Sequence, residues 1–124
     1  MILIGVNKAI DAHKETAFVK SIDEIKKTPS GSLIVAEFNE RDLAFYANAD
    51  IALAIIVKNA REFILLSATK AAYAIAETEL AVKLQKLADH YLYDIKILAI
   101  ANANEIERIA ELGIDGVFAA KLTV

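Results

Sequence analysis

The 124-residue chain has no cysteine, no tryptophan, one proline and four glycines. Without cysteine it can form no disulfide, no thiolate nucleophile and no zinc ribbon. The small share of proline and glycine, together with 56% hydrophobic residues, argues against a disordered chain. An excess of positive charge is missing as well, because the formal net charge is -3. Binding to nucleic acid requires a basic face that neutralises phosphates, so we expect no nucleic-acid partner.

Long hydrophobic runs are also absent. The longest one, residues 51–57, is far too short to cross a bilayer. The apolar run that follows Met1 lacks the length and the preceding basic segment of a secretory signal. We therefore expect a cytoplasmic protein that does not enter a membrane, with residues 1–124 forming a single α/β domain.

Short apolar runs recur along the whole chain and predict strands. They cover residues 2–6, 33–38, 51–57, 72–76, 95–101 and 116–120. Most of these runs are continuously apolar instead of alternating, which is typical of parallel strands that are buried on both faces. We expect Ile55, Ile75, Leu98 and Val117 to be among the most buried residues.

Helix starts are marked by polar residues that precede acidic ones. The predicted N-caps are Asn39, Asn59, Thr78 and Asn102. Side-chain oxygens at such positions accept hydrogen bonds from the free N–H groups of the first turn. The pattern predicts helices over residues 60–70 and 78–91, the second with an apolar stripe at helical spacing. Gly113 stands where a left-handed helix end is needed.

The alternation of strands and helices predicts an α/β fold with right-handed crossovers. We expect a three-layer domain with a mostly parallel sheet of five or six strands and helices on both faces. A partial TIM-barrel-like β-α array is the alternative, although so few strands cannot close an eight-fold barrel. Residues 9–32 are the least regular part, with a short strand at 16–19 and a brief helix that begins near Ser21 as the best assignments.

The final quarter of the chain carries a local resemblance. The stretches 97–102, 105–107 and 111–118, which end in Leu-Gly-Ile-Asp-Gly-Val-Phe, are similar to the last β-α-β unit of many TIM barrels. Glycerophosphodiester phosphodiesterases are one such group. The resemblance implies a β-α unit in this region. The histidine and metal-binding carboxylate motifs of that enzyme family are absent, so no site residue is carried over.

Polar residues at the carboxyl ends of the predicted strands are the candidate ligand-binding residues. They are Lys8, Glu37, Lys58, Asn59, Glu77, Asn102 and Lys121. Ligands of open α/β sheets bind beyond these ends, so the lysines favour a small anionic ligand, phosphorylated or carboxylated. The structural alternative is that polar residues end the strands of every such fold and cap the next helix.

Catalytic chemistry has weaker support. Lys58 or Lys121 would suit a Schiff base only if its ammonium group were desolvated. Glu37 and Glu77 would form an acid–base pair only if their strands were neighbours. His13 is expected at the same edge, but a lone histidine makes a poor metal site. No glycine-rich phosphate loop or nucleophile elbow occurs, and we predict no metal and no cofactor.

Two functions from different classes follow. The leading hypothesis is a non-catalytic, self-associating or partner-binding protein, most simply a homodimer, because the chain has more apolar residues than a small sheet with four helices needs. The alternative is a small enzyme or binding protein for an anionic metabolite. The residues expected at a dimer contact are the aromatic residues Phe18, Phe45 and Tyr46 and the cluster 91–93.

Overall fold

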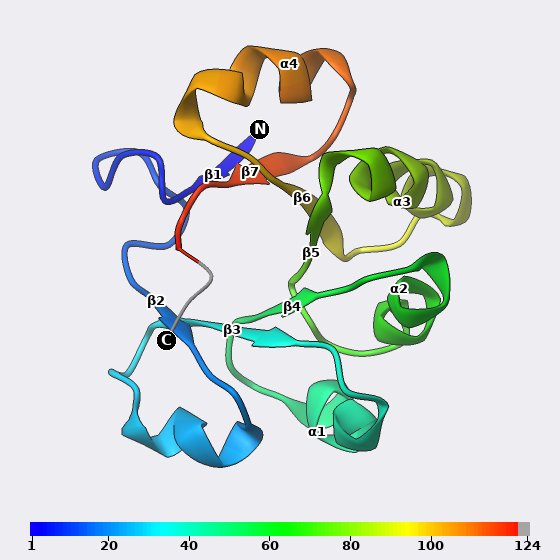
Figure 1. Cartoon of the computed structure of the whole chain (residues 1–124). Coiled ribbons are helices and arrows are strands. Elements are labelled where there is room, and N and C mark those ends of the chain that lie inside the picture. Colours follow the sequence, from blue (N-terminus) through cyan, green and yellow to red (C-terminus); the bar gives the residue numbers. More distant parts are fainter. Residues whose placement is uncertain (122–124) are drawn as a thin grey trace.

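Seven parallel strands form one sheet that curls into a half-barrel (Figure 1). The computed structural model describes residues 1–121. The strands are β1 Ile2–Ile4, β2 Thr16–Phe18, β3 Leu33–Glu37, β4 Leu53–Ile56, β5 Tyr73–Glu77, β6 Lys96–Ile100 and β7 Gly116–Phe118. The α-helices are α1 Leu43–Asn48, α2 Ala60–Ser67, α3 Thr78–Tyr91 and α4 Ile106–Glu111. Short 3-10 helices are η1 Ile22–Lys27, η2 Glu40–Asp42 and η3 Ala103–Glu105.

The strand order follows the chain around the curl. From one edge to the other it is β1-β7-β6-β5-β4-β3-β2, and all six pairings are parallel. From β3 to β7, each strand therefore lies beside the strand before it in the chain. The first two strands lie at opposite edges, and residues 5–15 cross the open side between them (Figure 1).

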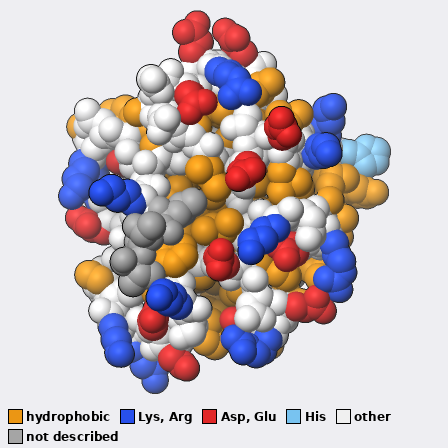
Figure 2. Space-filling view, viewed as in Figure 1, with side chains coloured by type: hydrophobic (Ala, Val, Ile, Leu, Met, Phe, Trp, Pro, Cys, Tyr) orange, Lys and Arg blue, Asp and Glu red, His pale blue; other side chains and the backbone are white. Residues whose placement is uncertain are grey.

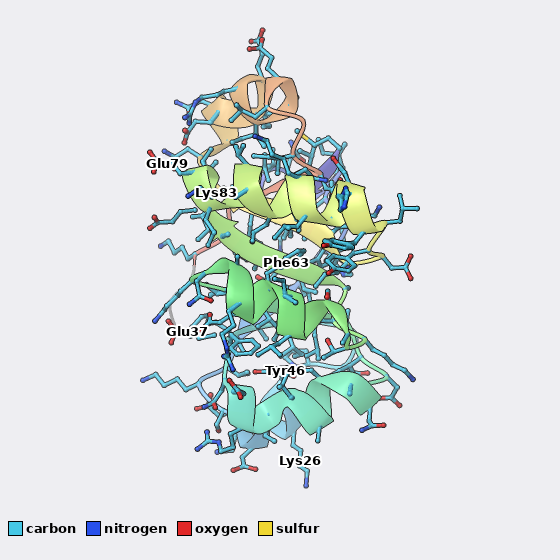
Figure 3. All side chains as sticks on the ribbon, turned by 90° about the vertical axis from the view of Figure 1, so that its right-hand side faces the viewer. Lys26, Glu37, Tyr46, Phe63, Glu79 and Lys83 are labelled. Carbon is cyan, nitrogen blue, oxygen red and sulfur yellow. The ribbon has the colours of Figure 1, made fainter. Side chains whose placement is uncertain are left out.

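The two faces of the sheet are buried in different ways. The inner face is formed by Ile4, Leu33, Val35, Ala54, Ile75, Leu98 and Phe118, which are at most 1% exposed. This cluster contains no helical residue, because the curled strands pack their inner side chains against one another. The outer face packs against the helices (Figure 1), through residues such as Leu84 of α3 and Phe63 of α2, the latter labelled in Figure 3.

The prediction of helices on both faces is therefore wrong. The helices surround only the outer face, and the sheet has seven strands instead of five or six (Figure 1). A continuously apolar strand is equally compatible with a flat sheet between two helical layers and with a barrel wall. The sequence pattern cannot separate them, and the alternative, a partial TIM-barrel-like array, describes the sheet better.

Several local predictions are confirmed. Ile55, Ile75, Leu98 and Val117 are all fully buried. Asn59 caps α2, since its side chain accepts a hydrogen bond from Glu62 N at 2.9 Å.

The start of α3 differs from its prediction. Thr78 is the first residue of this helix and not its cap, and Glu77, which occupies the cap position, makes no side-chain cap bond. Gly113 has the predicted positive φ, +77°. In the irregular region, the short strand predicted at 16–19 is β2, and the helix predicted after Ser21 is η1. Within residues 1–121, no helix is long and apolar enough to span a membrane.

Candidate functional site

The candidate ligand residues lie at one end of the half-barrel, where the strands finish. Figure 3 shows this end on its left-hand side, with Glu37 at the end of β3 and Glu79 at the start of α3. Figure 2 faces the same end, and it shows apolar side chains in the middle with lysines and acidic residues around them. All seven of the candidate ligand residues are exposed. The sequence therefore placed them at the correct end of the sheet.

Two of these residues share one cavity. Lys58 follows β4 and Glu77 ends β5, and both line a cavity of about 380 Å3 between the carboxyl ends of β4, β5 and β6. The other residues that line it are apolar: Ile56, Val57, Leu80 and Ile100. We call this the mouth cavity. It is open to solvent, and it combines an apolar floor with one cationic and one anionic side chain.

The apolar floor comes from two packing regions. Ile56 and Ile100 belong to the inner face of the half-barrel, at its last layer, where they are only partly buried. Leu80 lies in the first turn of α3 and packs against the outer cluster. Sequence reasoning missed these three residues as site residues. In the sequence, each of them has the pattern of an ordinary core residue. Only the order of the strands shows that they lie together around the mouth cavity.

The two charged side chains of the mouth cavity form no ion pair with other described residues. Among residues 1–121, neither the Lys58 ammonium group nor the Glu77 carboxylate belongs to an ion pair. Nearby, the Arg61 guanidinium group lies 2.8 Å from a Glu40 carboxylate oxygen, and this contact holds the pKa of Glu40 below its usual range. Lys58 and Glu77 are thus charged groups that remain available to a ligand.

The two candidate asparagines, Asn59 and Asn102, cap the starts of helical segments. The Asn59 side chain caps α2, and Glu62 Oε1 in turn accepts a hydrogen bond from Lys58 N at 2.9 Å. Asn102 forms a capping box with Glu105 at η3, where Glu105 Oε1 accepts from Asn102 N at 2.9 Å. These residues behave as the structural alternative expected, as caps that satisfy free N–H groups.

Lys8 and Lys121 do not join Lys58 in the mouth cavity. Lys8 lines a separate hollow beside the β1–β2 crossing, and its ammonium nitrogen is 3.5 Å from a Glu15 carboxylate oxygen. Lys121 is exposed at the end of the described residues. Neither Lys8 nor Lys121 lines the mouth cavity. Lys8 and Lys58 thus line separate hollows and do not face one shared anion-binding cavity.

The catalytic alternatives also lack the required geometry. β4 lies between β3 and β5, so Glu37 and Glu77 are not on neighbouring strands. Glu37 instead lines a separate hollow with Asn39 and Tyr46. Lys58 and Lys121 are exposed, which does not provide the desolvation that a Schiff-base lysine needs. Within residues 1–121, no group of three histidine or carboxylate side chains is placed to hold a metal ion.

His13 lies in the crossing segment, where it lines the same hollow as Lys8, but its ring contacts the amino end of β5. Its Nε2 atom and the hydroxyl oxygen of Tyr73, the first residue of β5, are 2.9 Å apart and share a hydrogen bond. Partial burial lowers the pKa of His13 and raises that of Tyr73. The crossing segment runs back toward the amino ends of the strands before β2 begins, and no sequence signal reveals this course.

Comparisons with known proteins give no further identification. No protein-family model matches the chain, and no curated protein matches it. The function must therefore be argued from the chemistry of the site itself.

Proposed function

We propose that the chain is a binding protein whose mouth cavity takes a small zwitterionic molecule with an apolar body. The observation that carries the proposal is that Lys58 and Glu77 line one cavity whose remaining lining is apolar. A cavity of about 380 Å3 is of the size that small-molecule sites have. An apolar amino acid is the simplest molecule of this class.

Each part of such a ligand has a matching group. Lys58 can donate hydrogen bonds to a carboxylate, and Glu77 can accept them from an ammonium group, in charge-assisted contacts. The apolar body would cover Ile56, Ile100 and Leu80, which are partly exposed. A ligand that carries only negative charge fits less well, because Glu77 would repel it.

A melting-temperature assay with three probes tests the proposal. L-leucine carries both charges, 4-methylpentanoate lacks the ammonium group, and isopentylamine lacks the carboxylate. A ligand that binds only the folded state raises the melting temperature. At a ligand concentration one hundred times the dissociation constant, the free energy of unfolding increases by about 2.7 kcal/mol. We expect L-leucine to raise it, and the two truncated probes to do so much less.

Two variants and one control connect this response to the cavity. Lys58→Ala and Glu77→Ala should each abolish the shift produced by L-leucine and leave the unliganded melting temperature nearly unchanged, because exposed charges contribute little to stability. Lys121→Ala is the matched control, and it should keep the full response. No shift with any apolar amino acid would refute the proposal. An equal response to 4-methylpentanoate would favour the anionic ligand instead.

Self-association is the second candidate function, as the composition suggests. The observation that favours it is the set of large apolar side chains exposed at the opposite end of the strands, among them Tyr91 and Leu92. Tyr46 does not contribute to such a contact, because it is only 2% exposed, and Phe18 and Phe45 are partly buried in the core clusters. Of the expected contact residues, the cluster 91–93 retains the role.

A further inference from the structure

Large apolar side chains are exposed mainly at the amino ends of the strands. Among residues 1–121, seven large apolar side chains are exposed, and five of them lie at the start of the chain or in the stretch that leads from the end of a helix into the next strand. These five are Met1 before β1, Ile51 before β4, Tyr91 and Leu92 before β6, and Leu112 before β7. We call them the amino-end surface. Such a concentration of exposed apolar groups marks an association site.

Leu92 is the most prominent member of the amino-end surface. It follows α3 in the left-handed conformation, with φ 56° and ψ 44°, and 84% of it is exposed. Leucine adopts this conformation at a cost in free energy, and glycine would occupy the position without that cost. The backbone N–H groups of Leu92 and Tyr93 both donate to Ala88 O, which closes the helix, but the Leu92 side chain itself stays exposed.

The residues on either side of Leu92 pack against each other and against α2. The rings of Tyr91 and Tyr93, on either side of it, stack with centroids 5.6 Å apart. Phe63 of α2, labelled in Figure 3, meets Tyr93 edge to face at 5.8 Å. A rigid aromatic support lowers the entropy that is lost when a side chain becomes fixed in an interface.

A groove lies directly beside this leucine. It has a volume of about 540 Å3, and residues 67, 69–72 and 92–95 line it. Lys70 and Asp94 are exposed at the groove, and neither belongs to an ion pair among residues 1–121. One surface thus carries a protruding apolar side chain, a groove and two opposite charges.

This combination is complementary to itself. We propose that two copies of the chain form a two-fold dimer through the amino-end surface, with Leu92 of each copy inserted into the groove of the other. A two-fold axis beside the groove also brings Lys70 of one copy toward Asp94 of the second. The proposal rests on the second candidate function and is independent of the mouth cavity, which lies at the opposite end of the strands.

The mass of the full chain in solution tests the dimer. We expect light scattering and sedimentation at micromolar concentration to give twice the chain mass of 13.5 kDa. Leu92→Asp should weaken association by at least about thirtyfold, as is typical of a central interface residue. Ile10→Asp is the matched control, because Ile10 is also exposed, at 61%, but lies in the turn after β1 at the other end. It should remain dimeric.

Two further variants separate association from folding. Leu92→Gly removes the side chain and relieves the left-handed strain, so it should be monomeric without a loss of melting temperature. Lys70→Asp and Asp94→Lys should each weaken the dimer, and the double variant should restore it, because the charges then pair again with reversed sign.

Four results would overturn the proposal. They are a mass of 13.5 kDa at all concentrations, a dimer that Leu92→Asp leaves intact, a dimer that Ile10→Asp dissociates equally, and a larger complex with another protein in place of the dimer. The dimer and the ligand proposal can fail independently, because Lys58→Ala and Glu77→Ala should abolish the response to L-leucine but leave the mass in solution unchanged.

Discussion

The two ends of the half-barrel are built from different residues. At the carboxyl end, all seven candidate ligand residues are exposed and polar or charged, and Asn59 and Asn102 cap helical segments. At the amino end, the exposed residues include Tyr91, Leu92 and Leu112. Both ends belong to the same strands, so the difference lies in the residues that connect the strands to the helices and not in the strands themselves.

Helix geometry explains the polar end. A strand that finishes at the carboxyl end leads into a helix, and the first N–H groups of this helix need acceptors, which asparagine and glutamate side chains provide. Helix carboxyl ends face the amino end of the sheet. Their free carbonyls are satisfied by backbone N–H groups, as when Tyr93 N donates to Ala88 O at 3.0 Å.

Capping therefore accounts for much of the polarity at one end, but nothing in folding requires exposed leucine at the other. This contrast determines where function is to be sought. At the carboxyl end, the candidates are the polar groups that cap nothing, and among these Lys58 and Glu77 share one cavity. At the amino end, the apolar groups themselves are the candidates.

Glycine substitutions give the largest expected contrast between the ends. Gly5 has φ +80° at the carboxyl end of β1, and a Cβ atom there would lie 2.3 Å from Ala120 N. Gly113 has φ +77° before β7, with nothing within 4 Å of the corresponding position. Both alanine variants incur strain from the positive φ, but only Gly5→Ala also forces the strand ends apart.

We expect Gly5→Ala to lower the free energy of unfolding by roughly 2–4 kcal/mol and Gly113→Ala by about 1 kcal/mol. Urea denaturation of the two variants measures the difference. Equal losses would show that β1 and the end of β7 do not approach each other as closely as the structure has them.

Neighbouring residues at the carboxyl end provide a second, smaller contrast. Asn59→Ala removes the cap of α2 and should cost about 1 kcal/mol of the free energy of unfolding. Lys58→Ala, one position earlier, should change it by less than about 0.5 kcal/mol, because an exposed and unpaired lysine contributes little. Urea denaturation of both variants without ligand is the measurement. A larger loss for Lys58→Ala would assign this lysine a structural role and weaken the ligand proposal.

Much of the fold could be predicted from local sequence, because local energetics determine it. Continuous apolar runs located the five strands from β3 to β7, and the pair Asn59 and Glu62 located the start of α2. The curvature of the sheet could not be predicted, since Ile75 and Leu98 would be equally buried in a flat sheet under a second layer of helices. Curvature depends on how all strands pack together.

The site was predictable only in part for the same reason. The position of Lys58 and Glu77 after strands predicted their end of the sheet, but their common cavity requires the neighbouring order of β4 and β5. The left-handed backbone of Leu92 has no sequence signal, because glycine or asparagine usually marks that conformation. The course of residues 9–15, and with it the contact between His13 and Tyr73, depends on tertiary structure alone.

The smallest expected effect concerns an ionisable group at the amino end. Burial lowers the pKa of His13 below 6.5 in the folded chain, so the unfolded chain binds its proton more readily. This residue therefore makes the fold less stable as pH falls below 6.5, through the lowered pKa, and the effect vanishes above 6.5.

His13→Gln should reduce the difference between the free energies of unfolding at pH 7 and pH 5. Because burial is the cause of the shift, Tyr73→Phe, which removes only the hydrogen-bond partner, should keep most of that difference. Urea denaturation of the three proteins at both pH values decides the point. If His13→Gln showed the same difference as the unmodified chain, other groups would be responsible for it, and His13 would be no more shielded from water than the exposed residues at the carboxyl end.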